Sequence, residues 1–123
     1  MAVVRVLLVD DQVAFLRAMT SVVQETPGFE VAGEASSGEE SLVVAAELLP
    51  DLVLMDVNLP GIDGLEATRR LRGRDSPPAV LLLSTFDEDL GEQFVAESGA
   101  MAYVTKSVFG PEVLEAVWST AAR

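Results

Sequence analysis

The sequence lacks cysteine and histidine altogether, and it contains one tryptophan and one tyrosine among its 123 residues. Without cysteine the chain has no disulfide, no thiolate zinc ligand and no cysteine nucleophile. Without histidine every mechanism that is built on an imidazole is excluded for this chain. The chemistry that remains uses carboxylates, hydroxyls and amines.

Positive charge is also scarce, because 8 Lys and Arg residues against 20 Asp and Glu residues give a formal net charge of -12. This balance repels phosphate backbones and anionic lipid, so we expect no nucleic acid binding by this chain itself. Long apolar runs are missing as well. Residues 2–9 are interrupted by Arg5, unlike a signal peptide, and residues 42–55 contain three breaks, so we expect no membrane span and a cytoplasmic location.

Half of the residues are apolar and 23% are charged, which is typical of a folded chain and not of a disordered one. A length of 123 residues suits one compact domain with one buried core. We find no internal repeat and no linker, so we expect residues 1–123 to form a single domain.

Short apolar runs rich in β-branched residues alternate with helical patterns along the chain. This alternation predicts an α/β fold, with a parallel sheet covered by helices. The near-continuous apolar character of the first, third and fourth runs predicts interior strands. The expected strands are Val3–Val9, Phe29–Ala35, Leu52–Met55, Val80–Leu83 and Met101–Val104, and the helices following them run from Asp11 to Glu25, Ser37 to Pro50, Asp63 to Gly73, Asp87 to Gly99 and Gly110 onward.

Polar residues and glycines mark the ends of these helices. Ser37 and Glu40 have the spacing of a capping box that opens the second helix. The acidic residues 87–89 fall at the expected positive end of the fourth helix dipole, and Gly99 is placed to cap its far end. Gly91 falls early in this helix, where glycine costs up to about 1 kcal/mol relative to alanine. We therefore expect the fourth helix to be loosely held.

In an open parallel sheet the ligand site lies outside the carboxyl ends of the strands, so the residues after each apolar run are informative. Singly, an aspartate there is commonly a helix cap or turn residue, and a lone lysine is commonly a solvated charge. Together they bring carboxylates, hydroxyls and an amine to one edge of the sheet. These residues are Asp10 and Asp11 after the first strand, Asp56 after the third, Ser84 and Thr85 after the fourth, and Lys106 after the fifth.

The negative charge of three carboxylates at one edge of a sheet must be neutralised in part. Two carboxylates about 4 Å apart repel by roughly 4 kcal/mol at an effective dielectric constant near 20, so a cluster of three needs a cation or partial protonation. All of the available ligands are hard oxygens, which favours Mg²⁺ or Mn²⁺ over zinc or copper. Mg²⁺ commonly binds one or two carboxylates together with phosphate oxygens. The cluster therefore indicates a site that handles phosphoryl groups.

Five separated motifs stand in register along the chain. They are VLLVDDQ with Asp10 and Asp11, GEASSGEE, LVLMDVNLPGIDGLEATRRL with Asp56, LSTFDED with Ser84, and the Tyr-Val-Thr sequence before Lys106. In these motifs the chain resembles the receiver domain of two-component response regulators. VLLVDDQ, GEASSGEE and LSTFDED are most similar to receivers of the NarL/FixJ (LuxR-type) subfamily. The resemblance implies a flavodoxin-like, three-layer (βα)5 sandwich with a doubly wound five-stranded sheet in the order 2-1-3-4-5.

The resemblance also implies a role for each acidic residue. Asp56 would be the phosphoacceptor, forming an aspartyl phosphate (4-aspartylphosphate) by attack on a phosphohistidine of a sensor histidine kinase. Asp11, Asp56 and the backbone carbonyl of Asn58 would hold Mg²⁺, and Asp10 would act through water or as a further ligand. The chain would then be a phosphorelay switch that catalyses only its own phosphorylation and dephosphorylation, and not a turnover enzyme.

Further roles follow from the same resemblance. Lys106 would pair with the Asp56 carboxylate before transfer and with a phosphoryl oxygen after it. The hydroxyl of Ser84, which we prefer to Thr85, would bind another phosphoryl oxygen, and Tyr103 would turn inward when it does so. A tyrosine at the end of a strand is equally often a half-buried ring with a solvated hydroxyl. Phe86 would affect the access of hydrolytic water and slow the loss of phosphate.

Two features limit how far the family pattern applies to this chain. Many receivers have proline after the lysine, whereas this chain has Ser107, which leaves the conformation of the Lys106–Ser107 peptide open. The fourth helix, with its early Gly91, borders Ser84 and Tyr103. We therefore expect its packing to shift on phosphorylation.

Three other functions share part of the pattern. A flavodoxin-like redox protein would have the same fold, but the acidic loop at residues 10–12 would repel the phosphate of FMN. A metal-dependent phosphatase could use Asp56 in the Asp-Val-Asn sequence, although such enzymes usually need a longer chain. A receiver that is never phosphorylated would lack some of the acids, the hydroxyl or the amine, and all of them are present.

The resemblance finally suggests partners. Receivers of this subfamily commonly dimerise after phosphorylation and precede a helix-turn-helix domain that binds DNA, and no such domain lies within these residues. A dimer face could involve Trp118 with Leu114 or Val117, and Phe15 or Met19 on the first helix. Such residues more commonly just cover the sheet.

Overall fold

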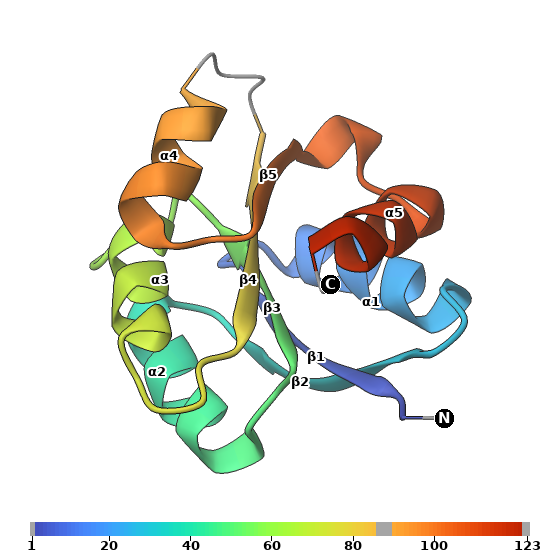
Figure 1. Cartoon of the computed structure of the whole chain (residues 1–123), viewed down its shortest axis with the longest axis horizontal. Coiled ribbons are helices and arrows are strands. Elements are labelled where there is room, and N and C mark those ends of the chain that lie inside the picture. The colour runs from blue at the N-terminus through green and yellow to red at the C-terminus, as the bar shows by residue number, and fades with distance from the viewer. Residues whose placement is uncertain (1, 86–89, 122–123) are drawn as a thin grey trace.

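The structure, a computed structural model, describes residues 2–85 and 90–121. The predictions for Phe86 and for the acidic residues 87–89 lie outside the described residues. Figure 1 shows the order of the elements. They are β1 (Val4–Val9), α1 (Val13–Glu25), β2 (Phe29–Ala35), α2 (Gly38–Leu48), β3 (Leu52–Asp56), α3 (Gly64–Arg72), β4 (Ala79–Ser84), α4 (Gly91–Ser98), β5 (Ala102–Thr105), a 3-10 turn (Lys106–Val108) and α5 (Pro111–Ala121).

The strands form a parallel sheet in the order β2-β1-β3-β4-β5, which confirms the predicted order and fold class. Helices α1 and α5 cover one face of this sheet, and α2, α3 and α4 cover the other (Figure 1). Strands β3 and β4 each extend further than predicted, so Asp56 and Ser84 are the last residues of their strands. Their backbones are therefore held by the sheet itself.

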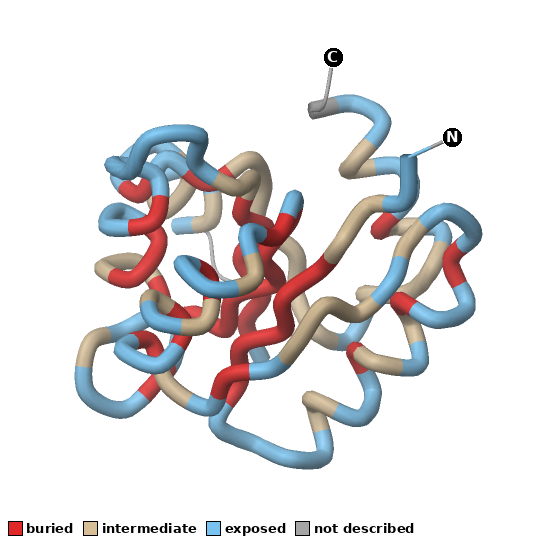
Figure 2. The backbone as a smooth tube through the Cα atoms, turned by 90° about the horizontal axis from the view of Figure 1, so that it is seen from below, coloured by how far each residue is buried: buried red, intermediate tan, exposed pale blue. Residues whose placement is uncertain are grey.

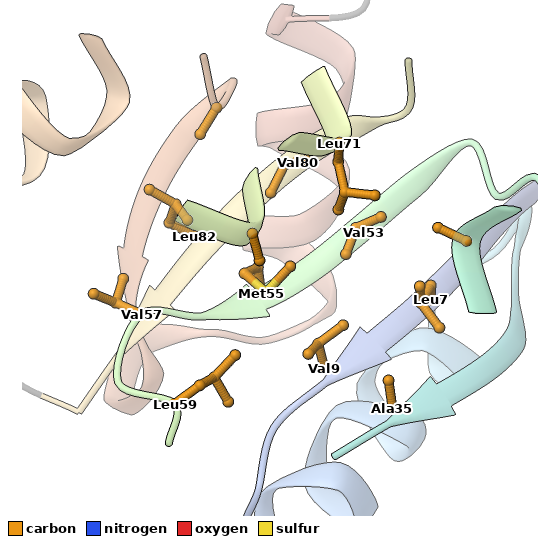
Figure 3. Close-up of a cluster of buried hydrophobic side chains, with 13 residues drawn as sticks. Leu7, Val9, Ala35, Val53, Met55, Val57, Leu59, Leu71, Val80 and Leu82 are labelled. Carbon is orange, nitrogen blue, oxygen red and sulfur yellow. The ribbon is translucent and has the colours of Figure 1, made fainter. Parts of the chain in front are cut away.

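The three central strands are largely buried on both faces, as their near-continuous apolar runs predict. Side chains alternate between two clusters, so that Val53 and Met55 of β3 pack toward α2, α3 and α4, while Leu52 and Leu54 pack toward α1 and α5. Figure 3 shows the first of these clusters, and Figure 2 shows buried residues concentrated along the central strands. Each such side chain contributes roughly 1.5–3 kcal/mol on burial. The polar residues of these strands therefore lie near the strand ends.

The far side of the sheet is closed by α1 and α5. Trp118 of α5 packs edge-on against Phe29 of β2, with ring centroids 6.2 Å apart. Leu114, also on α5, is fully buried. Met19 of α1 is also buried. In this chain these residues cover the sheet, which is the commoner of the two roles expected for them. No helix within residues 2–85 and 90–121 is long and apolar enough to cross a bilayer.

The sequence signals for the start of α2 and the end of α4 are found in the structure, with one difference at α2. Helix α1 begins at Val13, two residues after the expected Asp11, and α4 begins at Gly91, whereas its expected start at Asp87 lies outside the described residues. The Ser37 hydroxyl accepts a hydrogen bond from Glu40 N at 3.0 Å, as a capping box requires. The Glu40 carboxylate, however, accepts from Ser36 N at 2.6 Å and not from the capping residue. Gly99 ends α4 with φ of 84°, in the left-handed region that favours glycine.

The contact between Gly91 and Tyr103 explains why α4 has a glycine in its first turn. An ideal Cβ at Gly91 would lie 2.8 Å from Cδ1 of Tyr103, closer than two carbon atoms pack. The Tyr103 ring occupies this space and also contacts Phe94, with ring centroids 5.9 Å apart. The glycine therefore allows the tyrosine ring to lie against α4.

We expect Gly91→Ala to destabilise the protein, although alanine has the better helix propensity by about 1 kcal/mol. The new methyl group must displace the Tyr103 ring, and overpacking of this kind typically costs about 1–3 kcal/mol. In a Tyr103→Ala background the same change should stabilise the protein. Urea denaturation followed by circular dichroism measures both effects, and an equal gain in the two backgrounds would contradict the proposed contact.

Candidate functional site

The carboxyl ends of the strands bring the candidate residues to one edge of the sheet, as expected. Asp10 directly follows β1, Asp56 ends β3, Ser84 ends β4 and Lys106 follows β5. The register of β4 and β5 brings Ser84 and Lys106 close together, because Ser84 pairs with Thr105, the residue before Lys106. Backbone hydrogen bonds from Asp10 N to Ala35 O (3.2 Å) and from Val57 N to Leu83 O (2.9 Å) continue the sheet into the site. The sheet thus fixes the backbone on which the side chains stand.

The three aspartates form one cluster. Each of Asp10, Asp11 and Asp56 has a carboxylate oxygen within 4.8 Å of one on each of the others. Asp10 and Asp56 are 0% and 4% exposed, whereas Asp11 is exposed. Asp10 Oδ1 accepts a hydrogen bond from Gln12 N at 2.9 Å. Asp56 Oδ1 accepts from Asn58 N at 3.2 Å. These two hydrogen bonds orient the two buried carboxylates.

Lys106 supplies the positive charge of this cluster. Its Nζ donates to Asp10 Oδ2 at 2.6 Å and lies 3.5 Å from Asp56 Oδ2. The side chain is only 7% exposed. The structure therefore places the lysine next to Asp56, as the resemblance implies, but its shorter contact is with Asp10. The Lys106–Ser107 peptide bond is trans, since the described residues contain no cis peptide.

The pKa of Asp56 is raised from 3.8 to about 6, mainly by burial and next by the negative charge of Asp10. Lys106 and the Asn58 N–H act in the opposite direction but do not cancel these effects. Two buried carboxylates thus share one ammonium group, and a cation in the cluster would favour their charged forms. The donor set consists of hard oxygens, which fits Mg²⁺ or Mn²⁺.

The loop after Asp56 is held from two sides. An ideal Cβ at Gly64 would collide with the carbonyl oxygen of Asp56, so the start of α3 approaches the strand closely. Glu39, in the first turn of α2, accepts a hydrogen bond from Ile62 N at 3.2 Å, next to Gly61 with φ of 75°. The sequence indicated only that Glu39 belongs to the first turn of a helix. Nothing local to it identifies a partner 23 residues away.

The remaining candidate residues stand beside the acidic cluster. Ser84 is fully buried, whereas Thr85 is exposed, a difference consistent with the preference for Ser84. Tyr103 is half-buried on β5 and packs against Gly91 and Phe94 of α4. In this arrangement the tyrosine ring belongs to the core on that side of the sheet.

Proteins of known class are similar to this chain in sequence and in fold. A model of the response regulator receiver domain matches residues 6–118, and the chain therefore belongs to the response regulator receiver family. Response regulator GacA from Pseudomonas viridiflava is 41% identical over 114 residues, which are 93% of this chain and 53% of that protein. Transcriptional regulatory protein LiaR from Bacillus subtilis (strain 168) is 37% identical over 114 residues, 93% of this chain and 54% of that protein.

A crystal structure gives the same classification. The two-component response regulator of the LuxR family from Aurantimonas sp. SI85-9A1 matches with a TM-score of 0.87 and 32% identity, covering 98% of this chain and 86% of that one. Together with the curated relatives, it supports a receiver domain of the NarL/FixJ type. The chain spans about half the length of the curated relatives that it matches.

The raised pKa of Asp56 makes stability depend on pH in a definite direction. A carboxyl that protonates more readily in the folded state stabilises the fold below pH 3.8, and this contribution is lost as the pH rises through about 6. Without metal, Asp56→Asn should therefore raise the free energy of unfolding at neutral pH by on the order of 1–3 kcal/mol. The gain should shrink as the pH falls from about 6 toward 3.8.

Urea denaturation across this pH range measures the gain. Asp75→Asn removes an exposed carboxylate in the loop after α3 and serves as the matched control, with an expected change below about 0.5 kcal/mol. Mg²⁺ should stabilise the wild-type protein more than Asp56→Asn. Equal effects of Asp56→Asn and Asp75→Asn at all pH values would contradict the account of the buried cluster.

Proposed function

We propose that this chain is a phospho-accepting switch of a two-component system and that Asp56 is its phosphoacceptor. A carboxylate oxygen of Asp56 forms a bond to phosphorus while the bond from phosphorus to the imidazole nitrogen of a phosphohistidine breaks, and the imidazole keeps the electron pair. The observation that carries this proposal is the geometry of one cluster. A buried carboxylate lies 3.5 Å from the Lys106 ammonium and within 4.8 Å of two further carboxylates.

The residues present fit a divalent cation. We propose that Asp10, Asp11, Asp56 and the backbone carbonyl of Asn58 hold Mg²⁺, with Mn²⁺ as an alternative. When bound, Mg²⁺ neutralises charge on the phosphoryl oxygens during transfer. Lys106 exchanges part of its contact with Asp10 for a phosphoryl oxygen on Asp56. Its stem holds the ammonium within reach of both carboxylates, which lie 2.6 and 3.5 Å away.

The response to phosphorylation involves the neighbouring strands β4 and β5. Ser84 donates its hydroxyl hydrogen to another phosphoryl oxygen, since β4 lies beside β3 and both residues end their strands. Tyr103 then leaves the space against Gly91 and Phe94 and turns toward the site. Helix α4 repacks as a consequence, because the ring is part of its contact with the sheet.

The partners of the switch follow from its family and its charge. We propose that a sensor histidine kinase is the phosphoryl donor, because the chain has no histidine of its own. Residues 1–123 form one receiver domain in the cytoplasm, which dimerises on phosphorylation. DNA contact belongs to a C-terminal helix-turn-helix domain outside this chain, an arrangement supported by the similarity to transcriptional regulators and by the net charge of -12. The domain acts only on its own phosphoryl group and is not a turnover enzyme.

Acetyl phosphate with Mg²⁺ tests the central step. We expect one phosphoryl group per chain by intact-mass spectrometry, no transfer in the presence of EDTA and none to Asp56→Asn. Asp75→Asn, which removes an exposed carboxylate in the loop after α3, should accept the group like the wild-type chain. Repeated turnover of unrelated phosphoesters would support the phosphatase alternative, and a phosphorylated Asp56→Asn chain would place the acceptor elsewhere.

A second experiment separates the two hydroxyls at the end of β4. With beryllofluoride as a phosphoryl mimic, we expect faster amide exchange in α4 of the wild-type protein, and Ser84→Ala should reduce this change severalfold. Thr85→Ala, at the exposed neighbouring position, should leave it intact. The reverse pattern would transfer the role to Thr85, and no change in exchange in any variant would argue against the coupling to α4.

A further inference from the structure

The ring of Phe15 lies against the only lysine of the sequence. The Lys106 Nζ is 3.7 Å from the centroid of the Phe15 ring, a distance and placement typical of a cation–π contact. Phe15 stands in the first turn of α1, one helical turn beyond Asp11, and Lys106 opens the turn after β5. The sequence suggested only a covering or dimer-forming role for Phe15. The fold brings together two residues that are far apart along the chain.

Three groups of the described residues lie close to the ammonium group of Lys106. Asp10 Oδ2 lies 2.6 Å away, Asp56 Oδ2 3.5 Å away and the Phe15 ring 3.7 Å from Nζ. With only 7% of the side chain exposed, these neighbours take the place of most of the water that would otherwise solvate the charge. A phenyl face attracts the ammonium without accepting a directed hydrogen bond. It therefore does not compete with either carboxylate for the N–H groups.

A small cavity of about 50 Å³ adjoins this contact. Apart from the lysine, all of its lining side chains are apolar. The Phe15 ring and Lys106 therefore both border this largely apolar space. The lining residues are Phe15, Ala18, Met19, Val22, Leu83, Lys106 and Phe109.

We propose that Phe15 is a positioning residue for phosphoryl transfer, because its ring face keeps the Lys106 ammonium dry and within reach of Asp56. The effect on transfer rests on the function proposed above for Asp56. Charge stabilisation weakens when water enters a site, because the effective dielectric constant rises. A leucine would fill part of the space but would present no aromatic face to the charge. A tyrosine would present the same face as phenylalanine.

A spectroscopic experiment tests the contact without any phosphorylation. Because the chain contains one lysine, selective ¹⁵N and ¹³C labelling of lysine gives a single side-chain spin system. We expect the Cε and Nζ protons of Lys106 to be shifted upfield by the ring in the wild-type protein and in Phe15→Tyr. The shift should be lost in Phe15→Leu and in Phe15→Met, a second ring-free variant. Phe109→Leu removes a ring that lines the same cavity and should retain it.

The same variants then test the positioning role. We expect Phe15→Leu to lower the rate of phosphorylation by acetyl phosphate about fivefold, with the Kd for Mg²⁺ changed less than twofold. Phe15→Tyr should restore the rate, and Phe109→Leu should not alter it. Circular dichroism identifies any variant that fails to fold, and Phe15→Met replaces Phe15→Leu in that case.

The possible results are distinguishable. Loss of the upfield shift with an unchanged phosphorylation rate would overturn the positioning role while leaving Asp56 as the acceptor. An unshifted Lys106 signal in the wild-type protein would overturn the contact itself. A wild-type chain that accepts no phosphoryl group would overturn the function proposed for Asp56, and the role of Phe15 in transfer with it, even if the shift is present.

Discussion

Two buried carboxylates that share one ammonium group are the constraint around which this structure is organised. Asp10 and Asp56 are almost completely buried, and Lys106 reaches both. Removing the lysine would leave uncompensated charge in the interior, which typically costs about 3–5 kcal/mol. The raised pKa of Asp56 shows that the compensation is incomplete even with the lysine present. The site is therefore arranged to receive a further positive charge.

The parallel sheet makes this arrangement possible. All of its strands end at the same edge, and the residues that lead up to this edge in the central strands are apolar and buried. Polar residues at Asp56 and Ser84 are the last positions of β3 and β4, so their backbones stay within the hydrogen-bonded ladder. On one side of this fixed edge, Glu39 holds the loop after Asp56. On the other, Phe15 covers the lysine.

Much of this could be predicted from the sequence, because the signals for it are local. Apolar runs located the strands within one residue at either end, and the polar residues after them located Asp10, Asp56 and Lys106 at one edge. The space required at Gly91 could not be predicted, since it depends on the position of the Tyr103 ring. Local propensity alone suggested a loosely held helix at this point.

The contacts of Glu39 and Phe15 were missed for a similar reason. Glu39 binds a backbone N–H 23 residues away, and Phe15 of α1 contacts Lys106, which follows the last strand, β5. Both residues have an ordinary local interpretation, as an acid in the first turn of a helix and as an apolar residue on a helix face. Contacts between distant segments are fixed by packing and not by local pattern, so only the folded chain reveals them.

Charge balance connects these contacts to the function proposed for the site. With Asp10, Asp11 and Asp56 ionised, one lysine leaves the cluster negative, and a divalent cation would neutralise it. A phosphoryl group on Asp56 carries nearly two negative charges and replaces the single charge of the carboxylate, so the cluster gains about one negative charge. The ammonium of Lys106, the only lysine of the sequence, is the cation that the described part of the chain places beside Asp10 and Asp56. Its shorter bond is to Asp10, and its Nζ also lies 3.5 Å from Asp56 and 3.7 Å from the Phe15 ring centroid. Under the function proposed for Asp56, this spacing would let the ammonium change partner without leaving the Phe15 ring.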